Sequence, residues 1–465
     1  MKSSELLELG LPRALLPEAF QLIRTLKARG AGDDLRAAFE NVMQDPRAAT
    51  ADPELRALAE GVLARPKAHA PREAPAPYRI WGEGLEPGSL LQMKHAADLP
   101  VAVRGALMPD AHQGYGLPIG GVLATENAVI PYAVGVDIAC RMRLSVFDVE
   151  GAEGAFASPV RDRLRAALQD ETRFGVGAEF KGKLRRDHPV MEADWQVTPV
   201  TAKLRDRAWT QLGTSGSGNH FVEFGLLGIE REGAGLAPGT YLALLSHSGS
   251  RGTGATVASH YSKLAKELHP ELPAELRNLA WLDLDLSEGQ EYWHAMNLMG
   301  EYAAANHERI HHHVAQALGF EVLAVVENHH NFAWKEEHDG RELIVHRKGA
   351  TPAGPGVLGM IPGTMADPAF LVSGLGDPSS LRSASHGAGR RMSRTEARKR
   401  FTWEETRALL ADRNVELISA DIDEAPMAYK DIREVMAAQT DLVEVLGTFH
   451  PRLVKMAPAG ERPED

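Results

Sequence analysis

The side chains best suited to chemistry in this sequence are histidines set among small residues. His386 lies in the stretch Ser383-Ala-Ser-His-Gly-Ala-Gly-Arg390, whose small neighbours leave room for a bulky group, such as a nucleotide, on the imidazole ring. Three further histidine motifs and the only cysteine lie upstream, each in a glycine-rich or polar setting. Together these residues predict a metal-assisted active site with a histidine nucleophile.

Candidate metal ligands adjoin strand-like segments. Asp137 and Cys140 lie three residues apart in a loop of small residues, where a carboxylate and a thiolate can converge on a metal. His220 and His247 lie in glycine-rich loops, and His330 follows the apolar run Val322-Leu-Ala-Val-Val. Taken singly, Cys140 fits a buried structural cysteine equally well, and each histidine fits a satisfied polar residue better. Three histidine loops in the same architectural position favour a metal site.

The ligand types alone suggest zinc, because imidazole, thiolate and carboxylate groups are its usual ligands. They leave manganese or a two-metal site open, since a thiolate can bridge two ions and Asp137 can be the hard ligand of one. The histidines between His307 and His313 lie in a helical stretch without this loop pattern. We interpret them as helix surface or packing.

Two cationic stretches are candidates for phosphate binding. Arg390–Arg400 reads Arg-Arg-Met-Ser-Arg-Thr-Glu-Ala-Arg-Lys-Arg directly after the His386 loop. It is either a solvated helix face or a surface that meets phosphates. Val345–Gly356 is expected to be a long polar loop with paired cations, which either lines a phosphate channel or connects two strands.

The elements that must position these residues belong to an ordinary globular protein. The chain has 465 residues, 44% of them hydrophobic and 25% charged. No run of apolar residues is long enough for a transmembrane helix, and the N-terminal residues lack a signal-peptide core, which together favour a cytoplasmic protein without a membrane partner. The net charge of −12 argues weakly against nucleic-acid binding. A single cysteine excludes an intrachain disulfide.

The chain is expected to form a small helical segment followed by a larger α+β domain of mixed sheets flanked by helices. Leucine and alanine recur at helical spacing over residues 1–65, and the proline- and alanine-rich residues 66–77 read as an extended linker. From residue 78 to 457, buried-strand runs alternate with helices without a regular βαβ period. Ser393 with Glu396 and Thr402 with Glu405 fit capping boxes. Residues 458–465 are expected to be a disordered tail.

The ordered motifs resemble the RtcB family of RNA-splicing and RNA-repair ligases, with a similarity that runs from about residue 82 to residue 455. The chain is placed in a divergent branch that carries an N-terminal helical extension. The motifs that carry the resemblance are Met108-Pro-Asp-Ala-His-Gln-Gly-Tyr-Gly-Leu-Pro-Ile-Gly-Gly121, Val134-Gly-Val-Asp-Ile-Ala-Cys140, Gly216-Ser-Gly-Asn-His-Phe-Val-Glu223, His247-Ser-Gly-Ser-Arg-Gly252, His330-Asn331, Arg347-Lys-Gly-Ala350, His386-Gly-Ala-Gly-Arg390, Asp423-Glu-Ala-Pro-Met-Ala-Tyr-Lys430 and Val435-Met-Ala-Ala-Gln-Thr-Asp-Leu-Val-Glu-Val445.

The resemblance implies a role for each matching residue. His386 is similar to the nucleophile that attacks the α-phosphate of GTP, and Cys140 to a thiolate that bridges two Mn²⁺ ions. His220 and His247 would complete the coordination of one ion, and Asp137 and His330 would complete that of the other. The residues implied in guanylate binding are Asn219, Phe221, Glu223, Asn331, Thr364, Ala388, Gly389, Tyr429 and Lys455. Arg251 and Arg390 are implied in RNA or phosphate contacts.

The implied activity is a GTP- and Mn²⁺-dependent RNA ligase. It would join 2′,3′-cyclic phosphate or 3′-phosphate ends to 5′-hydroxyl ends through a histidine–GMP intermediate, in tRNA splicing or RNA repair. The partners implied are RNA, as tRNA halves or damaged RNA, and an archease-type activator. The chain departs from the usual family pattern at Arg141, Thr364 and Ala369. The departures bear on metal access and nucleotide preference.

Two other functions compete with this reading. A metal-dependent phosphoesterase that opens cyclic phosphates without ligation would keep the metal residues but would need neither His386 nor the guanylate pocket. A non-enzymatic RNA-binding module using Arg390–Arg400 would leave the metal residues unexplained. Retention of His386, Glu223 and Lys455 favours the ligase.

Overall fold

The chain forms two compact units. The computed structural model describes residues 1–11, 15–30, 35–63 and 72–461. One unit comprises Met1–Pro71 with Asp283–Gln290, and the other comprises Arg72–Leu282 with Glu291–Asp465. The expected linker and tail lie partly outside the described residues, since 64–71 and 462–465 are not described.

The first unit is built from short amphipathic helices around a core of its own. Leu6, Phe39 and Val42 are completely buried in this core, and Leu58 contributes to it. The described helices are α1 (Ser3–Glu8), α2 (Leu16–Ala28), α3 (Leu35–Gln44), α4 (Pro46–Ala49) and α5 (Arg56–Leu63).

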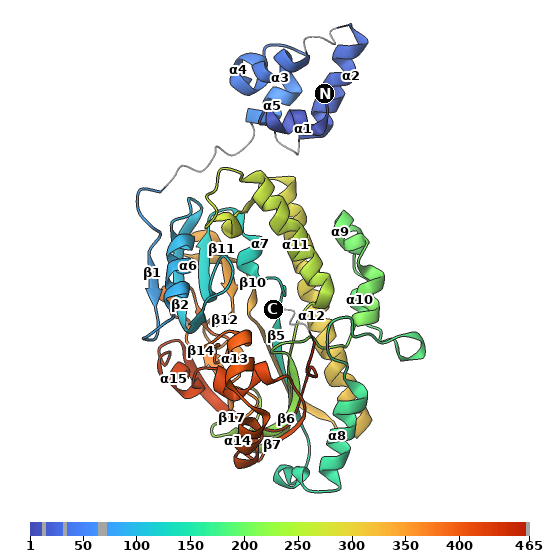
Figure 1. Cartoon of the computed structure of the whole chain (residues 1–465), viewed down its shortest axis with the longest axis vertical. Coiled ribbons are helices and arrows are strands. Elements are labelled where there is room, and N and C mark those ends of the chain that lie inside the picture. The colour runs from blue at the N-terminus through green and yellow to red at the C-terminus, as the bar shows by residue number, and fades with distance from the viewer. Residues whose placement is uncertain (12–14, 31–34, 64–71, 462–465) are drawn as a thin grey trace. The chain divides into compact units, whose positions relative to one another are not determined.

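The second unit mixes sheets and helices, which confirms the predicted α+β class (Figure 1). Its larger sheet has the strand order β13-β14-β17-β6-β7-β5-β9, with β16 paired to β17, and a second sheet has the order β1-β2-β3-β11-β10. The remaining strands form the pairs β12-β15 and β4-β8. The strands are β1 (Tyr78–Ile80), β2 (Ala102–His112), β3 (Ile119–Thr125), β4 (Ala128–Val129), β5 (Arg141–Phe147), β6 (Phe221–Ile229), β7 (Gly239–Ser248), β8 (Leu282–Asp283), β9 (Val322–His329), β10 (Asn331–His338), β11 (Arg341–Lys348), β12 (Ala350–Pro352), β13 (Leu358–Ile361), β14 (Ala369–Gly374), β15 (Ser383–Ser385), β16 (Glu416–Ser419) and β17 (Val443–Met456).

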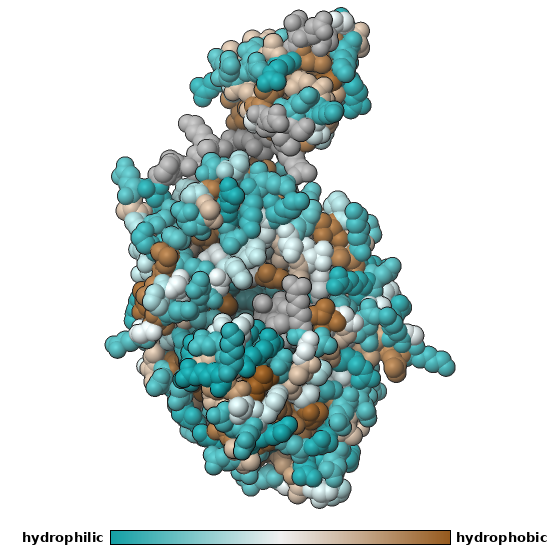
Figure 2. All heavy atoms as spheres, viewed as in Figure 1, coloured by the Kyte–Doolittle hydropathy of each residue, from teal (hydrophilic) through white to brown (hydrophobic). Residues whose placement is uncertain are grey.

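Helices cover these sheets, and the surface of the molecule in Figure 2 is largely hydrophilic. No helix in the described ranges has the length and apolar character needed to cross a bilayer. The helices beyond the first unit are α6 (Pro87–Ala97), α7 (Pro131–Val134), α8 (Val160–Glu171), α9 (Pro199–Ala202), α10 (Arg205–Gln211), α11 (Arg251–Leu268), α12 (Ser287–Leu318), α13 (Arg394–Arg400), α14 (Trp403–Asp412) and α15 (Ile432–Ala437).

The central strands of the larger sheet are buried on both faces, which explains why they read as continuous apolar runs. In β7, Leu242 and Leu244 pack into one apolar cluster, whereas Ala243 and Leu245 pack into another. Successive side chains of a strand point to opposite faces, so each face of β7 has its own core. The sheet is therefore a rigid platform for the loops at its edge.

Local sequence signals fix several helix starts. Thr402 and Glu405 form the predicted capping box, in which each side chain accepts a hydrogen bond from the other residue's backbone N–H. Ser393 caps α13 by accepting a hydrogen bond from the backbone N–H of Glu396.

The prediction of a polar loop over Val345–Gly356 is wrong. Residues up to Lys348 belong to β11, and Ala350–Pro352 form β12. Arg347 is completely buried, and its guanidinium makes two hydrogen bonds of 2.6 and 3.1 Å to the carboxylate of Glu336 on the paired strand. A charged side chain that is paired in this way can lie in the interior of a sheet. The prediction of a loop was wrong because it took the charged residues of this stretch as a sign of solvent exposure.

Candidate functional site

The predicted metal ligands meet at one edge of the larger sheet because four neighbouring strands begin or end there. Cys140 precedes β5, His220 precedes β6, His247 lies at the end of β7, and His330 follows β9. The order β6-β7-β5-β9 is continuous and each neighbouring pair is antiparallel. In an antiparallel pair the start of one strand lies next to the end of the other, so the starts of β6 and β5 and the ends of β7 and β9 meet at the same edge of the sheet.

The donor atoms of these residues lie within direct contact of one another. The Sγ of Cys140 is 3.3 Å from Nε2 of His220 and 3.1 Å from Nε2 of His247. Nε2 of His247 is also 3.1 Å from Nε2 of His330, and Nε2 of His220 is 3.2 Å from Oδ2 of Asp137. All five side chains belong to one buried cluster.

The structure divides the ligands differently from our expectation. One group that could hold an ion is Cys140, His247 and His330, and the other is Asp137, Cys140 and His220. The family resemblance implied His220 with His247, and Asp137 with His330, and the two groups that lie together in the structure differ from that pairing. Cys140 is common to both groups, as expected for a bridging thiolate.

The cluster fits metal ions better than it fits hydrogen bonds among its own members. Oδ2 of Asp137 and Nδ1 of His330 are buried without a hydrogen-bond partner. Burial raises the pKa of Asp137, but the interactions of the carboxyl with the adjacent His220 and with Cys140 and Arg251 outweigh burial and lower it. The group is therefore an anion facing imidazole nitrogens and a sulfur atom, which are the donor types that bind divalent transition metals.

Close approach of the loops requires glycine at one position of this centre. A Cβ atom at Gly249, two residues after His247, would overlap the carboxylate of Asp137. Only glycine lets the backbone after β7 lie against that carboxylate. The absence of a side chain at Gly249 therefore allows the Asp137 carboxylate to lie in the cluster.

His386 is held by a buried carboxylate that the sequence analysis did not single out. Nδ1 of His386 is 2.7 Å from Oδ2 of Asp110, which also accepts hydrogen bonds from the backbone N–H groups of His386 and Gly387. Asp110 is fully buried in β2. Burial raises the pKa of Asp110, but the hydrogen bond and charge of His386 outweigh it, so the carboxyl stays ionised.

A carboxylate only accepts hydrogen bonds, so Nδ1 of His386 carries the proton. In the neutral imidazole Nε2 then bears the lone pair, and the described residues offer it no hydrogen-bond partner. The rings of His386 and His330 lie 4.9 Å apart, centroid to centroid. The free nitrogen of His386 therefore lies beside the proposed metal cluster.

A cavity of about 570 Å³ joins the metal cluster to His386. The lining includes nearly all predicted site residues, namely Asp137, Cys140, Asn219, His220, Phe221, Glu223, His247, His330, Asn331, Thr364, His386, Ala388, Gly389, Arg390 and Tyr429. Burial raises the pKa of Glu223, which lies in the cavity wall, well above its usual value. Ala369 also lines the cavity.

Two predicted residues do not line the cavity. Nζ of Lys455 donates hydrogen bonds to the backbone carbonyls of Leu168, Gln169 and Thr172 around the end of α8. The side chain of Arg251 is buried and donates to Oγ1 of Thr214 and the carbonyl of Gly175. In this structure both side chains stabilise the surrounding loops.

Two further cavity residues were missed. Lys348 is buried at the end of β11, and burial lowers its pKa to about 7. Nδ1 of His112 lies 3.2 Å from the carbonyl of Asp110, and burial lowers the pKa of His112 to about 4. Both lie within motifs that carried the family resemblance, but nothing in their own sequence neighbourhood marks them as cavity residues.

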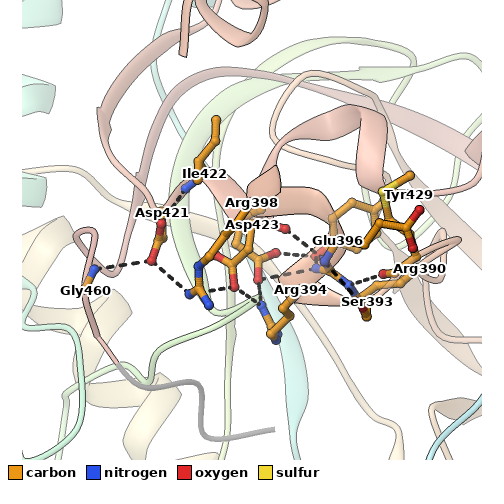
Figure 3. Close-up of polar contacts among 12 residues, drawn as sticks. Arg390, Ser393, Arg394, Glu396, Arg398, Asp421, Ile422, Asp423, Tyr429 and Gly460 are labelled. Carbon is orange, nitrogen blue, oxygen red and sulfur yellow. Dashed lines mark hydrogen bonds and ion pairs between the residues drawn. The ribbon is translucent and has the colours of Figure 1, made fainter. Parts of the chain in front are cut away.

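Three arginines of the cationic stripe Arg390–Arg400 pair with a nearby acidic segment (Figure 3). Arg390 lies 3.6 Å from the carboxylate of Glu424, and Arg394 pairs with Asp423 and Glu424. Arg398 lies 3.1 Å from Asp421 and 3.0 Å from Asp423. These three arginines therefore form neither a solvated helix face nor a free phosphate-binding surface.

Metal binding should depend on Cys140 and not on His386. We expect Cys140→Ala to lose metal from both groups, because the thiolate is their only shared donor. The matched variant His386→Ala should keep its metal, because His386 is not part of either group. Metal content after dialysis, measured by mass spectrometry, checks this. Full metal occupancy in Cys140→Ala would contradict the shared role of the thiolate.

Comparison with known proteins places the chain in a family. The family model "tRNA-splicing ligase RtcB" matches residues 92–456. The RNA-splicing ligase RtcB of Escherichia coli K12 is 35% identical over 80% of this chain and 96% of its own. The tRNA-splicing ligase RtcB of Nanoarchaeum equitans is 32% identical over 79% and 91%, and the RNA-splicing ligase RtcB of Mycobacterium tuberculosis is 32% identical over 75% and 95%. The chain therefore belongs to the RtcB family of RNA ligases.

Proposed function

We propose that this RNA ligase depends on GTP and Mn²⁺ and joins RNA 3′-phosphate or 2′,3′-cyclic phosphate ends to 5′-hydroxyl ends. The reaction proceeds through a GMP group carried by His386, in tRNA splicing or RNA repair in the cytoplasm. The observation that carries the proposal is the Asp110–His386 pair, which leaves a free imidazole nitrogen in the cavity beside the metal cluster.

The pair prepares His386 as a nucleophile. Asp110 holds the proton on Nδ1 and orients the ring, so that the lone pair of Nε2 faces the cavity. Nε2 attacks the α-phosphorus of GTP, an N–P bond forms, and pyrophosphate leaves. Asp110 also stabilises the positive charge that the ring acquires during the attack.

The GMP group then passes to RNA and activates it. An oxygen of the RNA 3′-phosphate attacks the phosphorus on His386, the N–P bond breaks, and the RNA end carries GMP. The 5′-hydroxyl of the second RNA attacks the 3′-phosphate, loses its proton, and displaces GMP as the new phosphodiester forms. Both displacements require the reacting groups to be held in line, which an enclosed cavity favours.

The metal ligands support the same chemistry. Asp137, Cys140, His220, His247 and His330 would hold two ions, with Cys140 shared between them. When bound, the ions neutralise phosphate charge next to His386. The donor types fit Zn²⁺ as well as Mn²⁺, and the choice of manganese rests on the resemblance to the family.

Glu223 is the residue best suited to select guanine. Guanine presents two adjacent donors, N1–H and the N2 amino group, whereas adenine presents an acceptor at N1. An ionised carboxylate can accept from both guanine donors. Glu223 is buried in the cavity wall, where this pairing would be well shielded from water.

A phosphoesterase without ligase activity is less consistent with this cavity. Such an enzyme would need the metal cluster but no nucleophilic histidine. A buried aspartate that only positions His386 would then have no use, although burying a charged carboxylate is costly. The Asp110–His386 pair therefore favours the ligase.

The covalent step can be tested by intact-protein mass spectrometry after incubation with GTP and Mn²⁺. Wild-type protein should gain one acid-labile GMP, and His386→Ala should gain none. Asp110→Asn should form the adduct about 10²- to 10⁴-fold more slowly, because the amide cannot hold the imidazole in the same tautomer or stabilise its charge. An adduct that forms equally well in His386→Ala would refute the nucleophile.

The affinity for GTP should rise with pH below the raised pKa of the ligand-free Glu223. Burial raises the pKa of Glu223, so the ligand-free side chain is neutral at low pH. Guanine donors favour the ionised form, so binding releases a proton and strengthens as pH rises toward the pKa of the free group. Calorimetric titration with GTP at several pH values checks this. Glu223→Gln should bind GTP more weakly and lose the pH dependence; an unchanged pH dependence in this variant would contradict the assignment.

A further inference from the structure

The segment between α8 and β6 carries a cluster of exposed cations that the proposed reaction does not use. Residues 173–209 contain eight Lys or Arg and five Asp or Glu residues, although the whole chain has a net charge of −12. Lys183, Arg185, Lys203 and Arg207 are exposed. We call these four residues the α10 cation surface, after the helix beside them.

The cations of this surface are free of carboxylate partners. Within the described ranges, none of the four makes an ion pair, whereas the neighbouring Lys181 pairs with Glu179 and Arg205 with Glu192. Three arginines of the Arg390–Arg400 stripe show the opposite situation, because Arg390, Arg394 and Arg398 pair with Asp421, Asp423 and Glu424 (Figure 3). Cations without an ion-pair partner attract a polyanion more strongly than paired cations, because less of their charge is offset locally.

An aromatic ring holds one of these cations in place. The guanidinium of Arg185 lies 4.1 Å from the ring centroid of Trp209, and that of Arg205 lies 5.1 Å from the same centroid. Stacking on an indole restricts the arginine without consuming its N–H donors. Arg185 therefore presents a preorganised guanidinium, the group best shaped to bind phosphate.

The surface is anchored to the loop that carries the metal ligand His247. A Cβ atom at Gly252, in the first turn of α11, would overlap Nη2 of Arg207. Arg251, the preceding residue, donates a 2.9 Å hydrogen bond to the carbonyl of Gly175, where the cationic segment begins. Helices α9 and α10 lie beside α11 (Figure 1). The cationic segment therefore packs against the start of α11, which follows the strand that carries His247, although none of the four cations lines the cavity.

We propose that the α10 cation surface binds the sugar–phosphate backbone of the substrate RNA outside the ends that are joined. The inference rests on the proposed function for the presence of an RNA substrate. A chain with a net charge of −12 repels RNA at long range, so binding needs local clusters of unpaired cations. The surface would hold the body of the RNA while the ends reach His386.

The test compares RNA substrates of two lengths. The probes are a stem-loop RNA with a 3′-phosphate overhang and a single-stranded 3′-phosphate trinucleotide, both measured without GTP by fluorescence anisotropy over a range of salt concentrations. The triple variant Lys183→Ala, Arg185→Ala, Lys203→Ala should bind the stem-loop at least about tenfold more weakly than the wild type. The slope of the logarithm of the binding constant against the logarithm of the salt concentration should become less negative by about two to three. Binding of the trinucleotide should not change.

A matched control distinguishes the effect of this surface on RNA binding from the effect of a general loss of positive charge. The triple variant Arg231→Ala, Arg341→Ala, Arg433→Ala removes the same charge from exposed positions elsewhere, and it should bind both probes like the wild type. Unchanged stem-loop binding in the first variant, or an equal loss in the control, would overturn the proposal. So would an equal loss for both probes.

Two further measurements keep the test independent of folding and of the proposed chemistry. The first variant should form the GMP adduct at the wild-type rate, which shows that its cavity is intact. If that variant misfolds, Lys183→Glu serves instead, because Lys183 is exposed on a short 3-10 helix (Gly182–Leu184) and charge reversal alone should weaken stem-loop binding. Unchanged binding in Lys183→Glu would then refute the surface. If the wild type forms no adduct, the proposed function fails, but the binding comparison still decides the RNA surface.

Discussion

The convergence of five donor atoms at one edge of the larger sheet is the constraint on which the rest of the site depends. Strands β6, β7, β5 and β9 bring Cys140 and three histidines together in a buried space. Water is largely excluded there, so the cluster would be costly to fold without cations to satisfy its lone pairs. Metal binding and folding of this edge should therefore be coupled.

The nucleophile comes from a different part of the fold. Asp110 lies on β2 of the smaller sheet, and His386 follows β15, which pairs with β12. The cavity thus lies between a metal-binding edge and an independently positioned histidine. This arrangement lets the metal ligands and the nucleophile be altered separately.

The sequence alone was most informative where one short segment carries the whole signal. The loops around Cys140, His220 and His247, the cap at Thr402, and the α+β class could be predicted from local pattern. The pairing of ligands could not, because it depends on strand order. The partners of Arg394 lie about 30 residues away along the chain, and Asp110 lies 276 residues from His386. Separations of that size leave no local pattern, so the neutralised arginines and the positioning aspartate became evident only in the fold.

The most direct test of the central claim is a crystal structure of the Mn²⁺-loaded protein with anomalous diffraction data. The account predicts two manganese peaks, both bonded to the sulfur of Cys140. One would also contact His247 and His330, and the other Asp137 and His220. A single peak, or two peaks that do not share Cys140, would contradict it.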